Sequence, residues 1–65
     1  MGPISQDKLK RLLETDRIPG SPEQLRKLCV RLGELVEMNG EGWVRENREA
    51  LLEQWSALVK KGWMR

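Results

Sequence analysis

Residues 21–40 read SPEQLRKLCVRLGELVEMNG, and this stretch contains the start, the apolar face and the end of one helix. Ser21 is suited to cap the N-terminus, Pro22 to occupy the first helical position, and Gln24, three residues after the cap, to complete a capping box. The Asn-Gly pair at the other end supplies the left-handed backbone with which many helices end. The sequence therefore predicts a helix over residues 22–38.

The apolar side chains of this helix fall on one face. At about 100° per residue they share an arc of roughly 120°, and they are Leu25, Leu28, Cys29, Leu32, Leu35 and Val36. Val30 is the one aliphatic residue on the charged far side. Gly33, at the edge of the apolar face, lets another backbone approach closely. We therefore expect one neighbouring surface to cover this face.

A shorter helix is predicted upstream, over residues 6–14, with Ser5 as its N-cap. Its short apolar stripe consists of Leu9, Leu12 and Leu13. A helix of this length is not stable by itself in water, so it must pack against the rest of the chain. The Pro-Gly pair within residues 15–20 indicates a tight turn, and we expect Ile18 in that segment to fill part of the core.

The longest helix is predicted downstream, over residues 42–62. Its central apolar stripe consists of Val44, Leu51, Trp55 and Leu58. Other apolar side chains widen the stripe on both flanks, and these are Leu52, Val59, Trp43 and Trp63. One neighbouring helix cannot cover so wide an arc. The helix must therefore contact both earlier helices, or one of them and a second protein chain.

The pattern as a whole predicts an all-α fold, because no stretch shows sustained period-two alternation and leucines recur at three- and four-residue spacing. We predict one domain over residues 1–65. It is a small three-helix bundle in which the second and third helices form an antiparallel hairpin and the short first helix packs across their seam. With one cysteine and no histidine, the thin core of such a chain has neither an intrachain disulfide nor the usual structural zinc site to support it. Well-packed helices or self-association must then stabilise the fold.

Catalytic groups are scarce in this sequence. Histidine is absent, which removes the usual general base and the commonest metal ligand. Gly40 and Gly42 lack the strand, the third glycine and the lysine of a phosphate-binding loop. Cys29 lies on the leucine-rich face, so we expect a buried, inert thiol. We therefore predict that the protein is not an enzyme and that it uses no metal, no cofactor and no small-molecule substrate.

Composition favours a cytoplasmic protein. Twelve Lys and Arg residues against ten Asp and Glu residues leave a net charge of +2, which does not indicate any particular class of partner. The sequence has no secretory segment and no apolar run of about 20 residues, and a free cysteine is typical of reducing compartments. The basic and aromatic cluster at residues 60–65 is too short to hold a lipid surface firmly. We therefore expect no membrane attachment.

Protein–protein interaction is the function that these patterns favour. Tryptophan is enriched in interface hot spots, and all three tryptophans belong to the region of the longest helix. The expected contact residues are Trp43, Leu51, Leu52, Trp55, Leu58, Val59 and Trp63. In a homodimer, two-fold symmetry would place this patch against its own copy. Another helical protein is the other expected partner.

A DNA- or RNA-binding regulator is the alternative, because two helices joined by a short Gly-containing turn are similar to a helix-turn-helix. The residue types able to contact bases and phosphates are Arg45, Asn47, Arg48, Lys60 and Lys61. Glutamates also lie in and directly before the same predicted helix, namely Glu41, Glu46, Glu49 and Glu53; they repel phosphates, and the helix has no basic face. Nucleic acid is therefore the less favoured partner.

Overall fold

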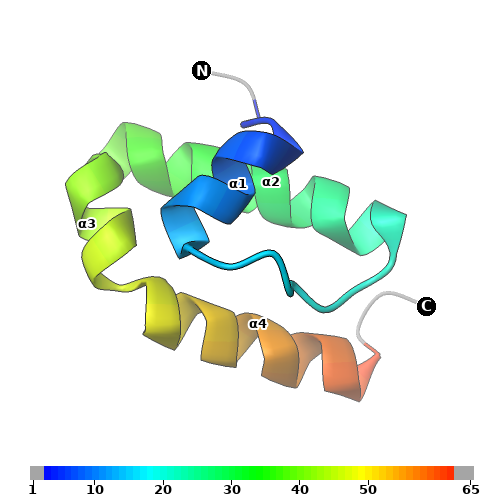
Figure 1. Ribbon diagram of the computed structural model, residues 1–65. Helices are drawn as coiled ribbons and strands as arrows, with labels where there is room; N and C mark the ends of the chain where they lie inside the picture. Colours follow the sequence, from blue (N-terminus) through cyan, green and yellow to red (C-terminus); the bar gives the residue numbers. More distant parts are fainter. Residues whose placement is uncertain (1–2, 63–65) are drawn as a thin grey trace.

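Helices make up the whole regular structure of the computed structural model, which describes residues 3–62 (Figure 1). They are α1 (Gln6–Leu13), α2 (Pro22–Asn39), α3 (Glu41–Glu46) and α4 (Arg48–Lys61), and no strand occurs among the described residues. The radius of gyration of 11.0 Å is close to the roughly 11 Å expected of a folded chain of this length. The prediction of an all-α fold is confirmed.

The N-terminal capping signals of the sequence form as expected. The Ser21 hydroxyl accepts a hydrogen bond from the Gln24 N–H (3.2 Å), and Gln24 Oε1 accepts one from the Ser21 N–H (2.8 Å), which completes the capping box of α2. At the other end, the Gly40 N–H donates to the Val36 carbonyl (2.8 Å), but its backbone (φ 90°, ψ 160°) lies outside the left-handed helical region that the Asn-Gly pair predicts. The Ser5 hydroxyl accepts from the Lys8 N–H (3.1 Å) at the start of α1.

The prediction of one helix over residues 42–62 is wrong, because the chain breaks at Asn47 into α3 and α4. The backbone of Asn47 (φ −101°, ψ 12°) departs from the helical values near −63° and −42°. Its side-chain amide donates to the Trp43 carbonyl (2.8 Å), and Arg48 Nη1 donates to the Arg45 carbonyl (2.7 Å). These side chains bond to carbonyls of the last turn of α3, and such local bonds compete with helix continuation.

The break changes the expected hairpin. α3 rather than α4 packs closely on α2, whereas α4 packs on α1 and α3, and α2 and α4 form the least closely packed pair of helices. Figure 1 shows α2 and α4 running in opposite directions, with α1 in front of α2 and the connection between α1 and α2 passing alongside α4. The molecule is therefore a four-helix arrangement, not the predicted three-helix bundle.

The core collects the leucines of α1 and the apolar face of α2. Buried side chains from these helices include Leu9, Leu12, Leu13, Leu28, Cys29, Leu32, Leu35 and Val36. α3 adds Val44, and α4 adds a single buried residue, Trp55. Trp55 Nε1 donates to the Pro19 carbonyl (2.7 Å), so the α1–α2 connection lies against α4. Ile4, which the periodicity did not place in the core, is also buried, and its N–H donates to the Cys29 carbonyl (3.4 Å).

Candidate interaction groove between α2 and α4

A groove of about 340 Å³ opens where α2 and α4 pack least closely. Its lining comes from α2, α3 and α4 and from the residue that joins the last two: Leu28, Arg31, Leu32, Leu35, Trp43, Asn47, Ala50, Leu51, Gln54, Trp55 and Leu58. Its volume lies at the small end of the range of about 300–1,000 Å³ that is typical of ligand pockets. A groove of this size accepts a few apolar side chains, not a large cofactor.

The floor of the groove is apolar and firmly held. Leu28, Leu32 and Leu35 of α2 and Trp55 of α4 are all buried members of the core, and Leu51 packs against them half-buried. Because core side chains are close-packed in fixed rotamers, this floor is preformed. A preformed apolar floor lowers the entropic cost of binding a partner.

The rim carries two large exposed apolar side chains. Trp43 on α3 is 39% exposed and Leu58 near the end of α4 is 43% exposed. Between them, the exposed lining residues on the α4 side are Ala50 and Gln54. Arg31 is the only charged residue among the described residues that line the groove, in a protein in which 34% of residues are charged. Depletion of charge with aromatic enrichment is the composition of interface centres.

The groove brings together four of the seven predicted contact residues, namely Trp43, Leu51, Trp55 and Leu58. Leu52 and Val59 do not line it, and they pack half-buried against the core. Trp63 lies outside the described residues. Sequence reasoning missed the contribution of α2, and it also missed Ala50 and Gln54.

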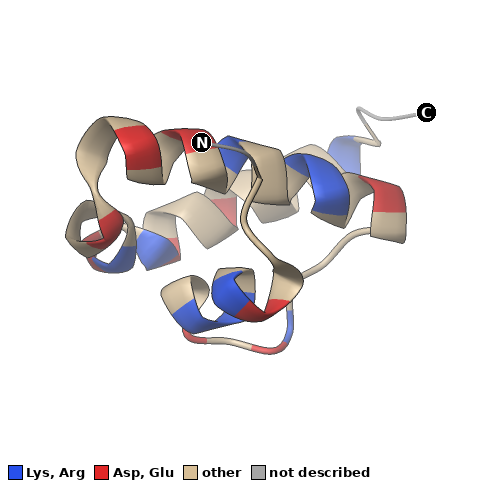
Figure 2. Ribbon diagram, turned by 90° about the horizontal axis from the view of Figure 1, so that it is seen from above, with Lys and Arg blue, Asp and Glu red and all other residues tan. Residues whose placement is uncertain are grey.

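The residues predicted for nucleic-acid binding do not form one face. Arg48 Nε pairs with Glu14 Oε2 at 2.8 Å, and the Asn47 amide is bonded to the Trp43 carbonyl. Lys60 and Lys61 lie in the last turn of α4, at the opposite end of that helix from Arg48. Figure 2 shows acidic and basic positions interspersed along the helices. The geometry therefore favours the apolar groove as the site.

Reactive groups are few around the groove. Cys29 is a buried core residue, and desolvation by that burial raises the pKa of its thiol. Within residues 3–62, no cluster of acidic or cysteine side chains is arranged to hold a metal ion, and no helix has both the length and the hydropathy needed to cross a bilayer.

Comparison with known proteins gives no relative from which a role could be transferred. No family model, no curated protein and no solved structure matches this chain. The groove itself is therefore the basis for a functional hypothesis.

Proposed function

We propose that this protein is a protein-interaction module and that it pairs with a second copy of itself across the groove between α2 and α4. The observation that carries this proposal is the exposure of Trp43 and Leu58 on the rim of one apolar groove. Burying such side chains contributes about 25 cal/mol per Å² of apolar surface removed from water. A soluble domain gains nothing from leaving both exposed beside a preformed floor unless a partner covers them.

A second copy fits the positions of these two residues. Trp43 lies on α3, before the break at Asn47, and Leu58 lies near the C-terminal end of α4, so these two residues lie toward opposite ends of the groove. A two-fold axis through the middle of the groove would exchange its ends, because the same patch is used on both subunits. Trp43 of one copy would then cover Leu58 of the other, and each exposed side chain would find an apolar neighbour.

The middle of the groove suits a two-fold axis as well. A charged residue there would meet its own charge, which is unfavourable. Ala50 and Gln54 occupy this position on α4 instead. Alanine lets two helices approach closely, and a glutamine amide has both donors and acceptors, so Gln54 can bond to its own copy. On the α4 side, the uncharged centre supports pairing of like with like, and Arg31 on the α2 side is the charged residue among the described lining residues.

The expected dimer is weak. The exposed surface of the chain is 4706 Å², and a small transient interface of about 600 Å² per copy would take about one eighth of it. We expect a dissociation constant on the order of micromolar or weaker for an interface of this kind.

The experiment is sedimentation equilibrium over a wide concentration range, with Leu58→Glu as the disrupting variant and Val30→Glu as its control. The two wild-type side chains are matched, since Leu58 is 43% exposed and Val30 is 45% exposed, but Val30 does not line the groove. We expect wild type and Val30→Glu to dimerise equally and Leu58→Glu to stay monomeric. Circular dichroism checks that both variants remain folded.

Two results would overturn self-association through the groove. One is a wild-type protein that stays monomeric at the highest concentration. If the groove of that monomer still binds an amphipathic helix of another protein, the helix is its occupant. The other is equal loss of dimer in Val30→Glu and Leu58→Glu, which would place the contact elsewhere.

A further inference from the structure

A row of charged side chains crosses the seam between α1 and the α3–α4 segment, on surface that the groove does not use. Lys8 Nζ pairs with Glu41 Oε2 at 2.8 Å at one end of the row, and Arg48 Nε pairs with Glu14 Oε2 at 2.8 Å at the other. In both pairs a cation on one side of the seam meets a carboxylate on the other. The ends of the row are therefore electrically balanced.

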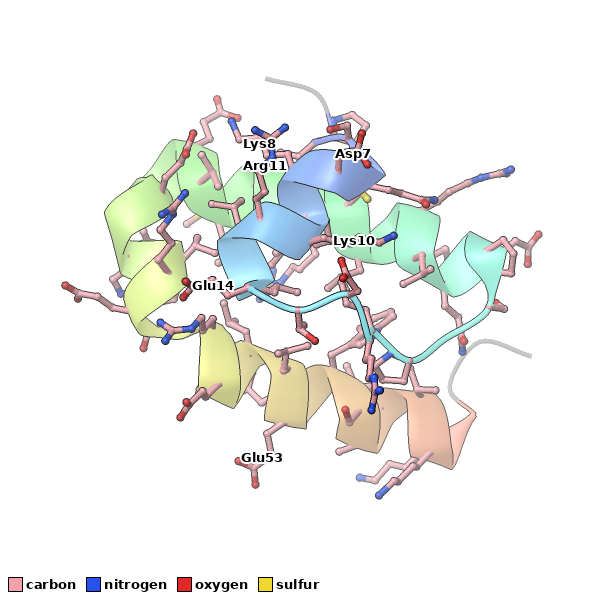
Figure 3. All side chains as sticks on the ribbon, in the orientation of Figure 1. Asp7, Lys8, Lys10, Arg11, Glu14 and Glu53 are labelled. Carbon is pink, nitrogen blue, oxygen red and sulfur yellow. The ribbon has the colours of Figure 1, made fainter. Side chains whose placement is uncertain are left out.

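The middle of the row is not balanced. Arg11 lies between Lys8 and Glu14 on α1, and Arg45 lies between Glu41 and Arg48 on the other side of the seam. Among the described residues, neither arginine side chain makes an ion pair. Figure 3 shows Lys8, Arg11 and Glu14 along the side of α1 toward α3, whereas Asp7 and Lys10 lie on its other side. In the middle of the row, therefore, two positive charges, those of Arg11 and Arg45, face each other across the seam with no carboxylate paired to either.

A depression of about 270 Å³ lies at this position. Its lining consists of Lys8, Arg11, Leu12, Glu41 and Arg45. Leu12 is buried in the core, so the floor is apolar and firm and the walls are cationic. Since Lys8 and Glu41 compensate each other, the lining carries two uncompensated positive charges.

This charge balance holds at neutral pH. A hydrogen bond from Lys8 and then the charge of Lys8 hold the pKa of Glu41 below its usual value, against an opposing effect of desolvation, and the charge of Arg45 adds the smallest contribution. Glu41 therefore stays ionised and paired with Lys8, and neither Arg11 nor Arg45 forms an ion pair with it.

We infer that Arg11 and Arg45 form a binding site for a phosphate group between α1 and α3. A phosphate monoester carries about −1.5 to −2 charges at pH 7, which matches the two uncompensated arginines. The planar guanidinium presents paired N–H donors that fit phosphate oxygens, and such charge-assisted bonds are the strong ones. Bound phosphate would also remove the repulsion between the two arginines. The site is independent of self-association through the groove.

The test is a titration of the folded protein with inorganic phosphate, followed by the NMR signals of the arginine Nε–H groups, against sodium chloride at matched ionic strength. We expect saturable binding of one phosphate, with the largest shifts at Arg11 and Arg45. Arg11→Gln and Arg45→Gln should each weaken binding about tenfold or more. Arg26→Gln, which removes the same charge from an exposed position of α2, should leave binding unchanged.

A second arm separates the two sources of a phosphate group, free phosphate and a phosphorylated side chain of a peptide. A phosphoserine peptide that binds more tightly than inorganic phosphate, and only with both arginines present, shows a site for a carried phosphate. Equal binding shows a site for the free ion. A response no larger than that to chloride, an equal loss in Arg26→Gln, or binding of a short DNA duplex without binding of phosphate would each overturn the assignment.

Discussion

Replacing Trp55 with phenylalanine tests how α4 is held to the rest of the protein. Trp55 is the single buried residue of α4, it is 6% exposed, and its indole N–H donates to the Pro19 carbonyl at 2.7 Å. The Gly20 backbone also lies against this ring. Phenylalanine keeps an aromatic ring in the core but removes the hydrogen bond and part of the ring volume. The variant therefore weakens the attachment of the α1–α2 connection to α4.

The expected loss is about 2 kcal/mol. The hydrogen bond contributes about 1 kcal/mol to stability, because water can reach the partly buried Pro19 carbonyl when the indole N–H is removed. The missing part of the ring adds about 1 kcal/mol, comparable to one or two buried methylene groups. A domain of this length has a total stability of about 3–10 kcal/mol. Alanine, which costs about 3–5 kcal/mol at a buried tryptophan, would risk unfolding the protein, so phenylalanine is the better probe.

The assay is urea unfolding followed by circular dichroism at a protein concentration too low for dimerisation. With a slope of about 1 kcal/mol per molar urea, the midpoint should fall by about 2 M. Trp43→Phe is the control, because the same change at a side chain that is 39% exposed should cost less than about 0.5 kcal/mol. Equal midpoints for the two variants would refute the reasoning, since Trp55 would then hold α4 no more firmly than a rim residue does.

Three further predictions concern the cap of α2, the seam and the thiol. Ser21→Ala should lower the free energy of unfolding by about 1 kcal/mol, measured by urea unfolding, because it removes the acceptor for the Gln24 N–H; an unchanged midpoint would mean that water replaces the cap. The pKa of Glu41 is lowered from 4.5 mainly by its hydrogen bond from Lys8. The stabilisation that the ionised Glu41 gives the folded protein is therefore fully present above pH 4.5 and is lost as the pH falls through the pKa of Glu41 in the folded state. The difference in urea midpoint between wild type and Glu41→Gln should therefore shrink as the pH falls below 4.5 and Glu41 becomes protonated, and a difference that does not shrink in acid would contradict it. Burial raises the pKa of Cys29, so a disulfide reagent should label it slowly in the native protein and rapidly in urea, whereas fast native labelling would show an exposed thiol.

Residues 21–40 could be interpreted from sequence because their signals are local. The serine cap and the glutamine that completes it lie three residues apart, and both form the expected contacts. The apolar face of α2 is likewise a property of one helix, and most of it is buried as predicted. Local capping and one-sided burial need no knowledge of the neighbouring helices.

The break at Asn47 was hidden by the apolar pattern on both sides of it. Asparagine is a poor residue for a helix interior, because its amide competes for backbone groups, and here it bonds to the Trp43 carbonyl. That signal is a few tenths of a kcal/mol in a single residue. A prediction based on periodicity alone follows the stripe of leucines, valines and tryptophans at helical spacing, so it continues the helix through Asn47.

The wide apolar arc of residues 42–62 needed tertiary structure for its explanation. The sequence showed that one helix could not cover it, but not that the α1–α2 connection would cover part of it. Ile18 and Pro19 lie in that connection, where Ile18 packs on the core and the Pro19 carbonyl holds Trp55. Leu52 and Val59 become half-buried core residues as a result. Which part of an arc stays open depends on the angles at which neighbouring helices cross, and no local pattern encodes them.

The groove follows from how the break redirects α4. α3 remains packed on α2, whereas α4 is directed to α1 and to the connection that holds Trp55, so its contact with α2 is the loosest between any two helices. Leu58, one turn beyond Trp55, is left 43% exposed. The fold thus buries Trp55 but leaves Leu58 exposed at the rim of the groove. A partner that covers Leu58 would complete the burial of this apolar surface.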